Sequence, residues 1–228
     1  MQNKHTEEFE LSQKTLREVA GILGFLLPIV LVVLGLIFSR SVQGSISAYY
    51  DLRTRDIFVG ALWAIGFILW AYKGYDSLDA AAGKVVCVLA LGVALFPYNG
   101  GAWIGWLHHS FAAVLFVVLA YFSLFLFTKT KHSPQGFWQS FSFHFDEIER
   151  DDVQKRRRNK VYVACGLFML ACIVFLLLYN ALWQQTAIAD FIIKPLLLAE
   201  TLMLWAFSIS WSIKGEWGVF WWLWLKDK

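Results

Sequence analysis

The stretch Val19–Phe38, which reads VAGILGFLLPIVLVVLGLIF, decides the class of this protein. Its 20 residues include no charged side chain, and a helix of roughly 20 apolar residues is what crosses about 30 Å of bilayer hydrocarbon. A charged stretch of 18 residues precedes it, and Ser39-Arg40-Ser41 behind it is a poor signal-peptidase site. We therefore expect a retained first transmembrane helix and not a cleaved leader.

Five further apolar runs complete the pattern. Hydrophobic residues make up 58% of the 228 positions and charged residues only 16%, against about 25% in soluble domains, which excludes a soluble globular protein. The second and third runs are short, and the third reaches spanning length only by including Ala80–Lys84. We predict an all-α fold: a polytopic membrane helix bundle of about six transmembrane helices, in a single transmembrane domain over 1–228. The predicted spans are about 19–38, 56–73, 81–98, 103–128, 161–183 and 192–213.

The basic residues separate cleanly when the loops alternate across six spans. One side holds both termini and the loop 129–160, and it carries 16 of the 20 Lys and Arg residues; the other side carries only Arg40, Arg53, Arg55 and Lys194. Cytoplasmic loops are the ones enriched in Lys and Arg. This bias predicts a multi-pass protein of the cell inner (plasma) membrane, with the N-terminus, the C-terminus and the loop 129–160 in the cytoplasm.

A cluster of four basic residues, Lys155–Arg158, immediately precedes the fifth span. Such a cluster fixes topology, and it can also attract anionic lipid headgroups, at about 1 kcal/mol per basic residue. Nucleic acid is not an expected partner, because four neighbouring acidic residues offset the charge: Glu147, Glu149, Asp151 and Asp152. The expected partners are the lipid bilayer, with a lipid or small solute as a candidate ligand and a membrane protein as a candidate partner.

Polar residues within spans are functional candidates because burying them in hydrocarbon is costly. Asp56, His108, His109 and Glu200 come from three predicted helices, and all fall in the outer third of the bilayer. The loop after the first span adds further polar groups close to the same face: Ser45, Ser47 and Tyr49. We predict an outer-face polar pocket built from these residues. The alternative is a hydrogen-bonded His–carboxylate pair that joins the fourth and sixth helices.

Zinc is the metal that this set of side chains could hold, with His108, Asp56 and Glu200 as three ligands. Adjacent histidines point about 100° apart on a helix, so only one of His108 and His109 would face the site. A His–carboxylate pair without metal could instead transfer protons. The three cysteines lie inside predicted spans without metal-ligand spacing. We predict no cofactor, with zinc as the alternative.

The sixth span carries a stripe of polar side chains at helical spacing, which includes Thr201, Trp205, Ser208 and Ser212. The stripe predicts a face turned into the bundle. Its hydroxyls either serve close packing between helices or bond to neighbouring helices.

Several short strings between Ser45 and Gly215 resemble those of uncharacterised bacterial six-span membrane proteins, with the layout of the DUF998 and Frag1/DRAM/Sfk1 types. That layout has six spans, a first external loop with functional character and a histidine in the fourth helix. The resemblance implies a six-span fold and no established activity. The matching strings are SISAYY at 45–50, RDIFVG at 55–60, AYKGYD at 71–76, ALFP at 94–97 and WAFSISW at 205–211.

A more distant likeness is to the intramembrane hydrolases that include alkaline ceramidases. The likeness implies that Ser45 or Ser47, Asp56 and His108 take the parts of that family's serine, aspartate and one zinc histidine. The family's paired histidines in a late helix are missing here, where Glu200 stands alone.

The function that these patterns favour is recognition of a lipid headgroup or small solute in the outer-face pocket, by a membrane protein of unassigned activity. A zinc-dependent intramembrane lipid hydrolase that uses the same residues is the first alternative. A membrane-embedded partner subunit is the second.

Overall fold

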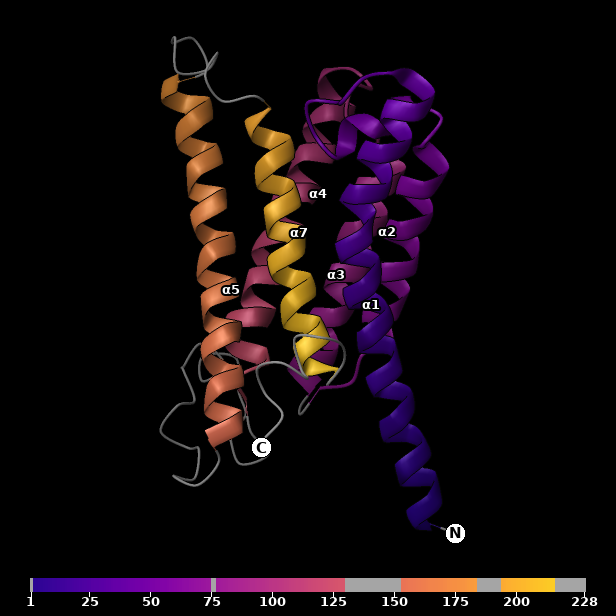
Figure 1. The fold of residues 1–228 in the computed structure, drawn as a ribbon, viewed down its shortest axis with the longest axis vertical. Coiled ribbons are helices and arrows are strands. Elements are labelled where there is room, and N and C mark those ends of the chain that lie inside the picture. The colour runs from indigo at the N-terminus through magenta and orange to yellow at the C-terminus, as the bar shows by residue number, and fades with distance from the viewer. Residues whose placement is uncertain (1, 75–76, 130–152, 184–193, 216–228) are drawn as a thin grey trace.

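The computed structural model describes residues 2–74, 77–129, 153–183 and 194–215. These residues form a helix bundle that contains no β-strand (Figure 1). The all-α prediction is therefore confirmed for the described part of the chain. Most of the predicted cytoplasmic loop 129–160 lies outside the described residues, and so do the first two residues of the predicted span 192–213.

Each predicted span falls on an α-helix, and short helical segments continue two of them. Gly101 precedes α4 with a φ of 90°, a conformation that favours glycine. Pro195 opens α7, where its missing N–H costs no helical hydrogen bond. The α-helices are α1 (Gln2–Ser39), α2 (Arg55–Trp70), α3 (Ser77–Leu95), α4 (Ala102–Tyr121), α5 (Val153–Leu178) and α7 (Pro195–Lys214). The shorter segments are η1 (Ser47–Asp51), η2 (Phe122–Leu126), which continues α4, and η4 (Tyr179–Trp183), which continues α5.

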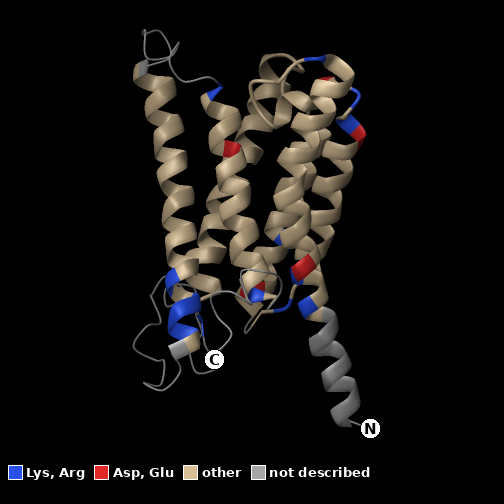
Figure 2. Ribbon diagram, viewed as in Figure 1, with Lys and Arg blue, Asp and Glu red and all other residues tan. Residues whose placement is uncertain are grey.

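Five helices in the described part of the chain are long and apolar enough to cross a membrane, and α2 is the one that falls short. Its 16 residues extend over about 24 Å, less than the roughly 30 Å of hydrocarbon. The third predicted span reached spanning length only by including Ala80–Lys84. In the structure it is a 19-residue helix that begins even earlier, at Ser77. Charged residues gather at the two ends of the bundle and leave its middle almost uncharged (Figure 2). The chain is a membrane-embedded helical protein.

The polar stripe of α7 packs directly on α1. A Cβ atom added at Gly21 would lie 2.6 Å from the Ser212 hydroxyl oxygen, and one added at Gly24 would lie 2.6 Å from that of Ser208. Small residues on both helices therefore let the backbones approach closely. Ser208 also donates its hydroxyl to the Leu204 carbonyl within α7. Close packing therefore accounts for Ser208 and Ser212, while the Trp205 Nε1–H of the same stripe donates to the Phe25 carbonyl of α1 at 3.1 Å.

One end of the bundle, which we call the capped end, carries the loop 40–54; the other we call the opposite end. The core near the opposite end is aromatic. The fully buried Trp211 ring lies 5.2–6.0 Å from four other ring centroids: those of Tyr72, Phe122, Phe127 and Phe207.

Beside this core, an ion pair is buried at the opposite end. Lys129 Nζ donates to Asp79 Oδ1 at 2.8 Å, and both side chains are at most 2% exposed. The pair ties the first turn of α3 to the segment that follows η2. Removing one member of such a pair leaves the other charge buried without compensation.

Candidate functional site

The loop after α1 is folded into the capped end and is not a solvated connection. Ser45, Ser47 and Tyr49 are all buried. The Tyr49 ring lies against Gly35, where an added Cβ would come within 2.5 Å of it. The Ser45 hydroxyl accepts a hydrogen bond from the Ala48 N–H at 3.0 Å. The predicted pocket residues of the loop therefore form the interior of a cap.

Glu200, in the second turn of α7, holds this cap to the bundle. One of its carboxylate oxygens accepts a hydrogen bond from the Ile46 N–H at 2.6 Å. Close by, the Leu197 N–H at the start of α7 donates to the Gly44 carbonyl at 3.0 Å. Both bonds join residues about 150 positions apart in the sequence. The buried Glu200 carboxylate therefore holds the loop after α1 against α7.

A small cavity of about 50 Å³ lies beneath the cap, among α1, α2, α3, α4 and α7. Glu200 and Ser47 line it, and its other lining side chains are apolar. A bound water takes up about 30 Å³. The cavity therefore has room for a very small polar solute and not for a lipid headgroup.

His108 lies next to this cavity but does not line it. Its side chain is fully buried, and Nδ1 lies 2.7 Å from the Phe96 carbonyl oxygen. Because a carbonyl only accepts, we assign the proton to Nδ1. The buried Nε2 has no hydrogen-bond partner among the described residues. Ala112, one turn further along the same face of α4, does line the cavity, so His108 forms the layer above it.

The remaining predicted pocket residues point elsewhere, and the structure does not bring His108, Asp56 and Glu200, the predicted zinc ligands, together. Asp56 and His109 are exposed, whereas His108 and Glu200 are buried and bonded to separate backbone groups. Among the described residues, no three His, Cys, Asp or Glu side chains are placed to hold a metal ion. His108, Asp56 and Glu200 were predicted to lie at one depth in the bilayer. The orientation of α2 about its own axis, however, points the Asp56 side chain away from the other two.

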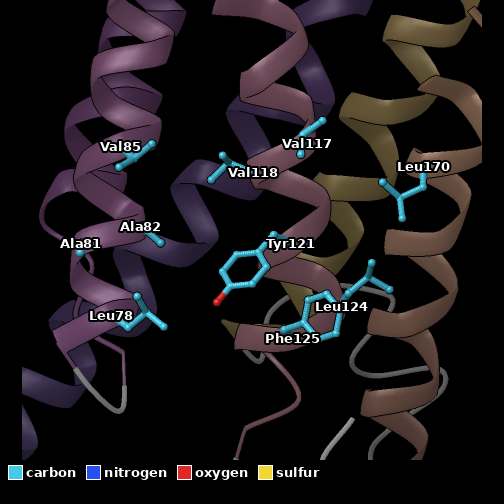
Figure 3. A pocket seen from close by; sticks show the side chains of 10 residues that line it. All are labelled: Leu78, Ala81, Ala82, Val85, Val117, Val118, Tyr121, Leu124, Phe125 and Leu170. Carbon is cyan, nitrogen blue, oxygen red and sulfur yellow. The ribbon is translucent and has the colours of Figure 1, made fainter. Parts of the chain in front are cut away.

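A larger recess lies towards the opposite end, between α3, α4 with η2, and α5 (Figure 3). We call it the groove. It encloses about 430 Å³, which is within the range of about 300–1,000 Å³ typical of ligand sites. Among the described residues that line it, the Tyr121 hydroxyl is the only polar side-chain group, and in Figure 3 the Tyr121 ring lies between α4 and α3. The lining residues are Leu78, Ala81, Ala82, Val85, Val117, Val118, Tyr121, Leu124, Phe125 and Leu170.

Small side chains on α3 and the peripheral position of α5 create this groove. Ala81 and Ala82 present only methyl groups where α3 faces α4. Only 22% of the residues in the most apolar stretch of α5 are buried, against 56% in that of α3. The helix α5 therefore lies at the edge of the bundle and does not close the groove. Sequence reasoning missed the groove because an alanine run within an apolar span ordinarily indicates close helix packing. The run Ala80-Ala81-Ala82 was the available signal.

Comparisons of this chain with protein-family models, with curated proteins and with solved structures found no match. The resemblance to the DUF998 and Frag1/DRAM/Sfk1 layouts therefore stays a prediction. Function must be inferred from the two sites themselves: the small capped cavity beside Glu200 and the apolar groove beside Ala81.

Proposed function

We propose that this chain is a multi-pass protein of the inner membrane that binds a membrane lipid, with an acyl chain of the lipid in the groove. The capped end faces the outside, and both termini are in the cytoplasm. The observation that carries this proposal is an apolar recess of about 430 Å³ among membrane-spanning helices.

The distribution of charge supports the orientation. The described cations of the capped end are Arg40, Arg53, Arg55 and Lys194, whereas α5 alone brings five cations to the opposite end within its first eight residues. Cytoplasmic segments near span ends carry the excess of Lys and Arg. The opposite end is therefore cytoplasmic, and the groove belongs to the inner leaflet.

The chemistry of the groove supports a hydrocarbon ligand. Its lining offers methyl, methylene and aromatic groups, and it opens sideways between helices that are surrounded by lipid. A polar solute would gain almost no hydrogen bonds there and would lose those it makes with water. An acyl chain gives up no hydrogen bonds on leaving the bilayer, and it exchanges van der Waals contacts with neighbouring lipids for contacts with a preformed surface.

Filling the groove tests this proposal. Ala81 is exposed and lines the groove, so the Ala81→Phe side chain would occupy the groove without entering the core. Ala164→Phe is the matched control, because Ala164 is an exposed alanine on α5 that does not line the groove. Phospholipid retained by detergent-purified protein is measured by native mass spectrometry. We expect severalfold less lipid on Ala81→Phe and wild-type amounts on Ala164→Phe. Equal retention by both variants would overturn the proposal.

The capped cavity favours a second candidate function, binding of a small polar solute. A buried carboxylate and a hydroxyl face about 50 Å³ of space, and a carboxylate in this setting is suited to a small cation. The test is thermal unfolding of purified protein at matched ionic strength in sodium, potassium, ammonium or choline chloride. We expect one of the three small cations to raise the Tm of the wild type relative to choline, and to have no effect on Glu200→Gln. The same Tm in all four salts would exclude this candidate.

A further inference from the structure

The face of α5 that meets the groove at Leu170 leads to two basic side chains at the start of that helix. Leu170 lines the groove, and Val163 and Arg156 precede it in the sequence by seven and fourteen residues. Residues seven apart lie on nearly the same face of a helix. Lys160 is one turn along from Arg156, at the edge of that face. Both basic side chains are exposed, so the groove side of α5 changes from apolar to cationic along its length.

Contacts between α5 and η2 fix the depth at which this change occurs. An added Cβ at Gly166 would lie 2.4 Å from Leu124, a groove residue. One turn lower, the Tyr162 and Phe127 rings are 5.4 Å apart. Lower still, Asn159 Nδ2 donates to the Thr128 carbonyl at 3.3 Å. Lys160 is therefore level with the segment that follows η2, and Arg156 lies about 6 Å beyond it.

The groove also ends at this level on α3. Leu78, its first lining residue on that helix, is the second residue of α3, and the neighbouring Asp79 is already paired with Lys129. No Asp or Glu occurs between Val153 and Leu178 in α5. A ligand that extends out of the groove therefore meets cations on α5 and no carboxylate on that helix.

From this continuity we propose that the ligand is an anionic phospholipid of the cytoplasmic leaflet, with its phosphate bound by Arg156 and Lys160. This inference rests on the proposed lipid-binding function and adds the headgroup class. Arginine binds phosphate oxygens through a planar, two-pronged set of N–H donors, and lysine adds a point charge. Each basic residue near an anionic lipid corresponds to roughly fivefold in binding. The apolar groove holds the chain, and the two cations select the headgroup.

Neighbouring residues of α5 provide a matched control. Arg157 follows Arg156 in the sequence and is exposed too, but it points about 140° away from the direction of Leu170. Arg156→Gln and Arg157→Gln therefore remove the same charge from the same turn, and only the first removes it from the groove side. The double variant Arg156→Gln/Lys160→Gln removes both proposed phosphate ligands.

The experiment offers delipidated full-length protein equal amounts of phosphatidylglycerol and phosphatidylethanolamine with identical acyl chains in mixed micelles. Bound lipids are counted by native mass spectrometry. We expect the wild type and Arg157→Gln to prefer phosphatidylglycerol about 25-fold, because Arg156 and Lys160 each contribute about fivefold. Arg156→Gln should lose about fivefold of that preference, and the double variant should bind both lipids equally. High salt should weaken the preference in the wild type.

The outcomes separate the two proposals. If Ala81→Phe loses both lipids while the double variant loses only the preference, the acyl groove and the headgroup site both stand. A wild type that binds both lipids equally, or an Arg157→Gln effect as large as that of Arg156→Gln, overturns the headgroup site and leaves the groove. If the wild type retains neither lipid, the lipid-binding function fails and the headgroup site fails with it.

Discussion

The two ends of this bundle use polar and apolar residues in opposite ways. At the capped end, polar side chains that are costly to bury point inward and form hydrogen bonds within the protein. One example is the bond that the Ile46 N–H donates to Glu200. The cavity that Glu200 and Ser47 line there measures about 50 Å³. Towards the opposite end, side chains that are apolar apart from the Tyr121 hydroxyl leave about 430 Å³ open between α3, α4 and α5.

This difference shows that buried polarity does not by itself mark the more spacious site. A polar group inside a membrane protein must find a partner, and the partner found here is the protein's own loop. Alanine methyl groups require no partner, so a gap beside them can stay open to lipid. The following predictions probe this contrast, from the largest expected effect on stability to the smallest.

The buried ion pair at the opposite end should give the largest effect. Asp79→Ala removes the carboxylate that pairs with the buried Lys129, and we expect a loss of about 3–5 kcal/mol in the free energy of unfolding. Asp51→Ala is the control, because it removes only an exposed hydrogen bond from Asn99 and should cost at most about 1 kcal/mol. Unfolding in mixed micelles measures both. Similar losses for the two variants would mean that the opposite end does not depend on this pair.

Removing the carboxylate that holds the cap should rank second. Glu200→Ala leaves the Ile46 N–H buried without its acceptor, at a cost of about 1–3 kcal/mol. Hydrogen exchange of the Ile46 amide should become faster at the same time. Asp56→Ala, at an exposed site, should change stability by less than about 0.5 kcal/mol. Unchanged exchange at Ile46 would show that Glu200 does not hold the loop.

The adjacent histidines offer a smaller and sharper comparison. His108→Phe removes the hydrogen bond to the Phe96 carbonyl, and we expect a loss of about 1 kcal/mol. His109→Phe changes an exposed residue and should stay within about 0.5 kcal/mol of the wild type. Thermal or denaturant unfolding of both variants provides the measurement. If His109→Phe proved the more costly change, the assignment of His108 to the layer above the cavity would be wrong.

Filling the groove should have the smallest effect on stability. Ala81→Phe places a ring in open space, and in lipid-free detergent it should unfold within about 0.5 kcal/mol of the wild type. In the presence of phospholipid the wild type should gain stability and Ala81→Phe should not, because only a lipid-bound native state is stabilised by mass action. Equal stabilisation of both proteins would place the bound lipid outside the groove.

Sequence reasoning reached the helical class, the count of about six helices and the candidates for burial. Long apolar runs have one stable solution in lipid, since every backbone group must be bonded within its own segment. The same reasoning overestimated the length of the second span. The helix stops at Trp70, and residues 72–74 are not helical, whereas the predicted span continued to 73.

For the candidate site residues, the sequence predicted how deep each side chain lies in the membrane, but it did not predict the direction in which the side chain points from its helix. His108 and Glu200 are both buried near the capped cavity, as their cost in hydrocarbon suggested. Asp56 and His109 lie at similar depth and face outward. Rotating a helix by 100° moves a side chain from core to lipid without changing its depth, and that rotation is set by packing with neighbouring helices.

What the sequence by itself determined is that this chain forms membrane-embedded helices, because 20 uncharged apolar residues such as Val19–Phe38 can satisfy their backbone in lipid only as a helix. Only the tertiary structure decided that the loop after α1 folds inward onto Glu200, and that α5 stands far enough from α3 to leave a groove. Both depend on contacts between segments many residues apart, whose geometry no local pattern encodes.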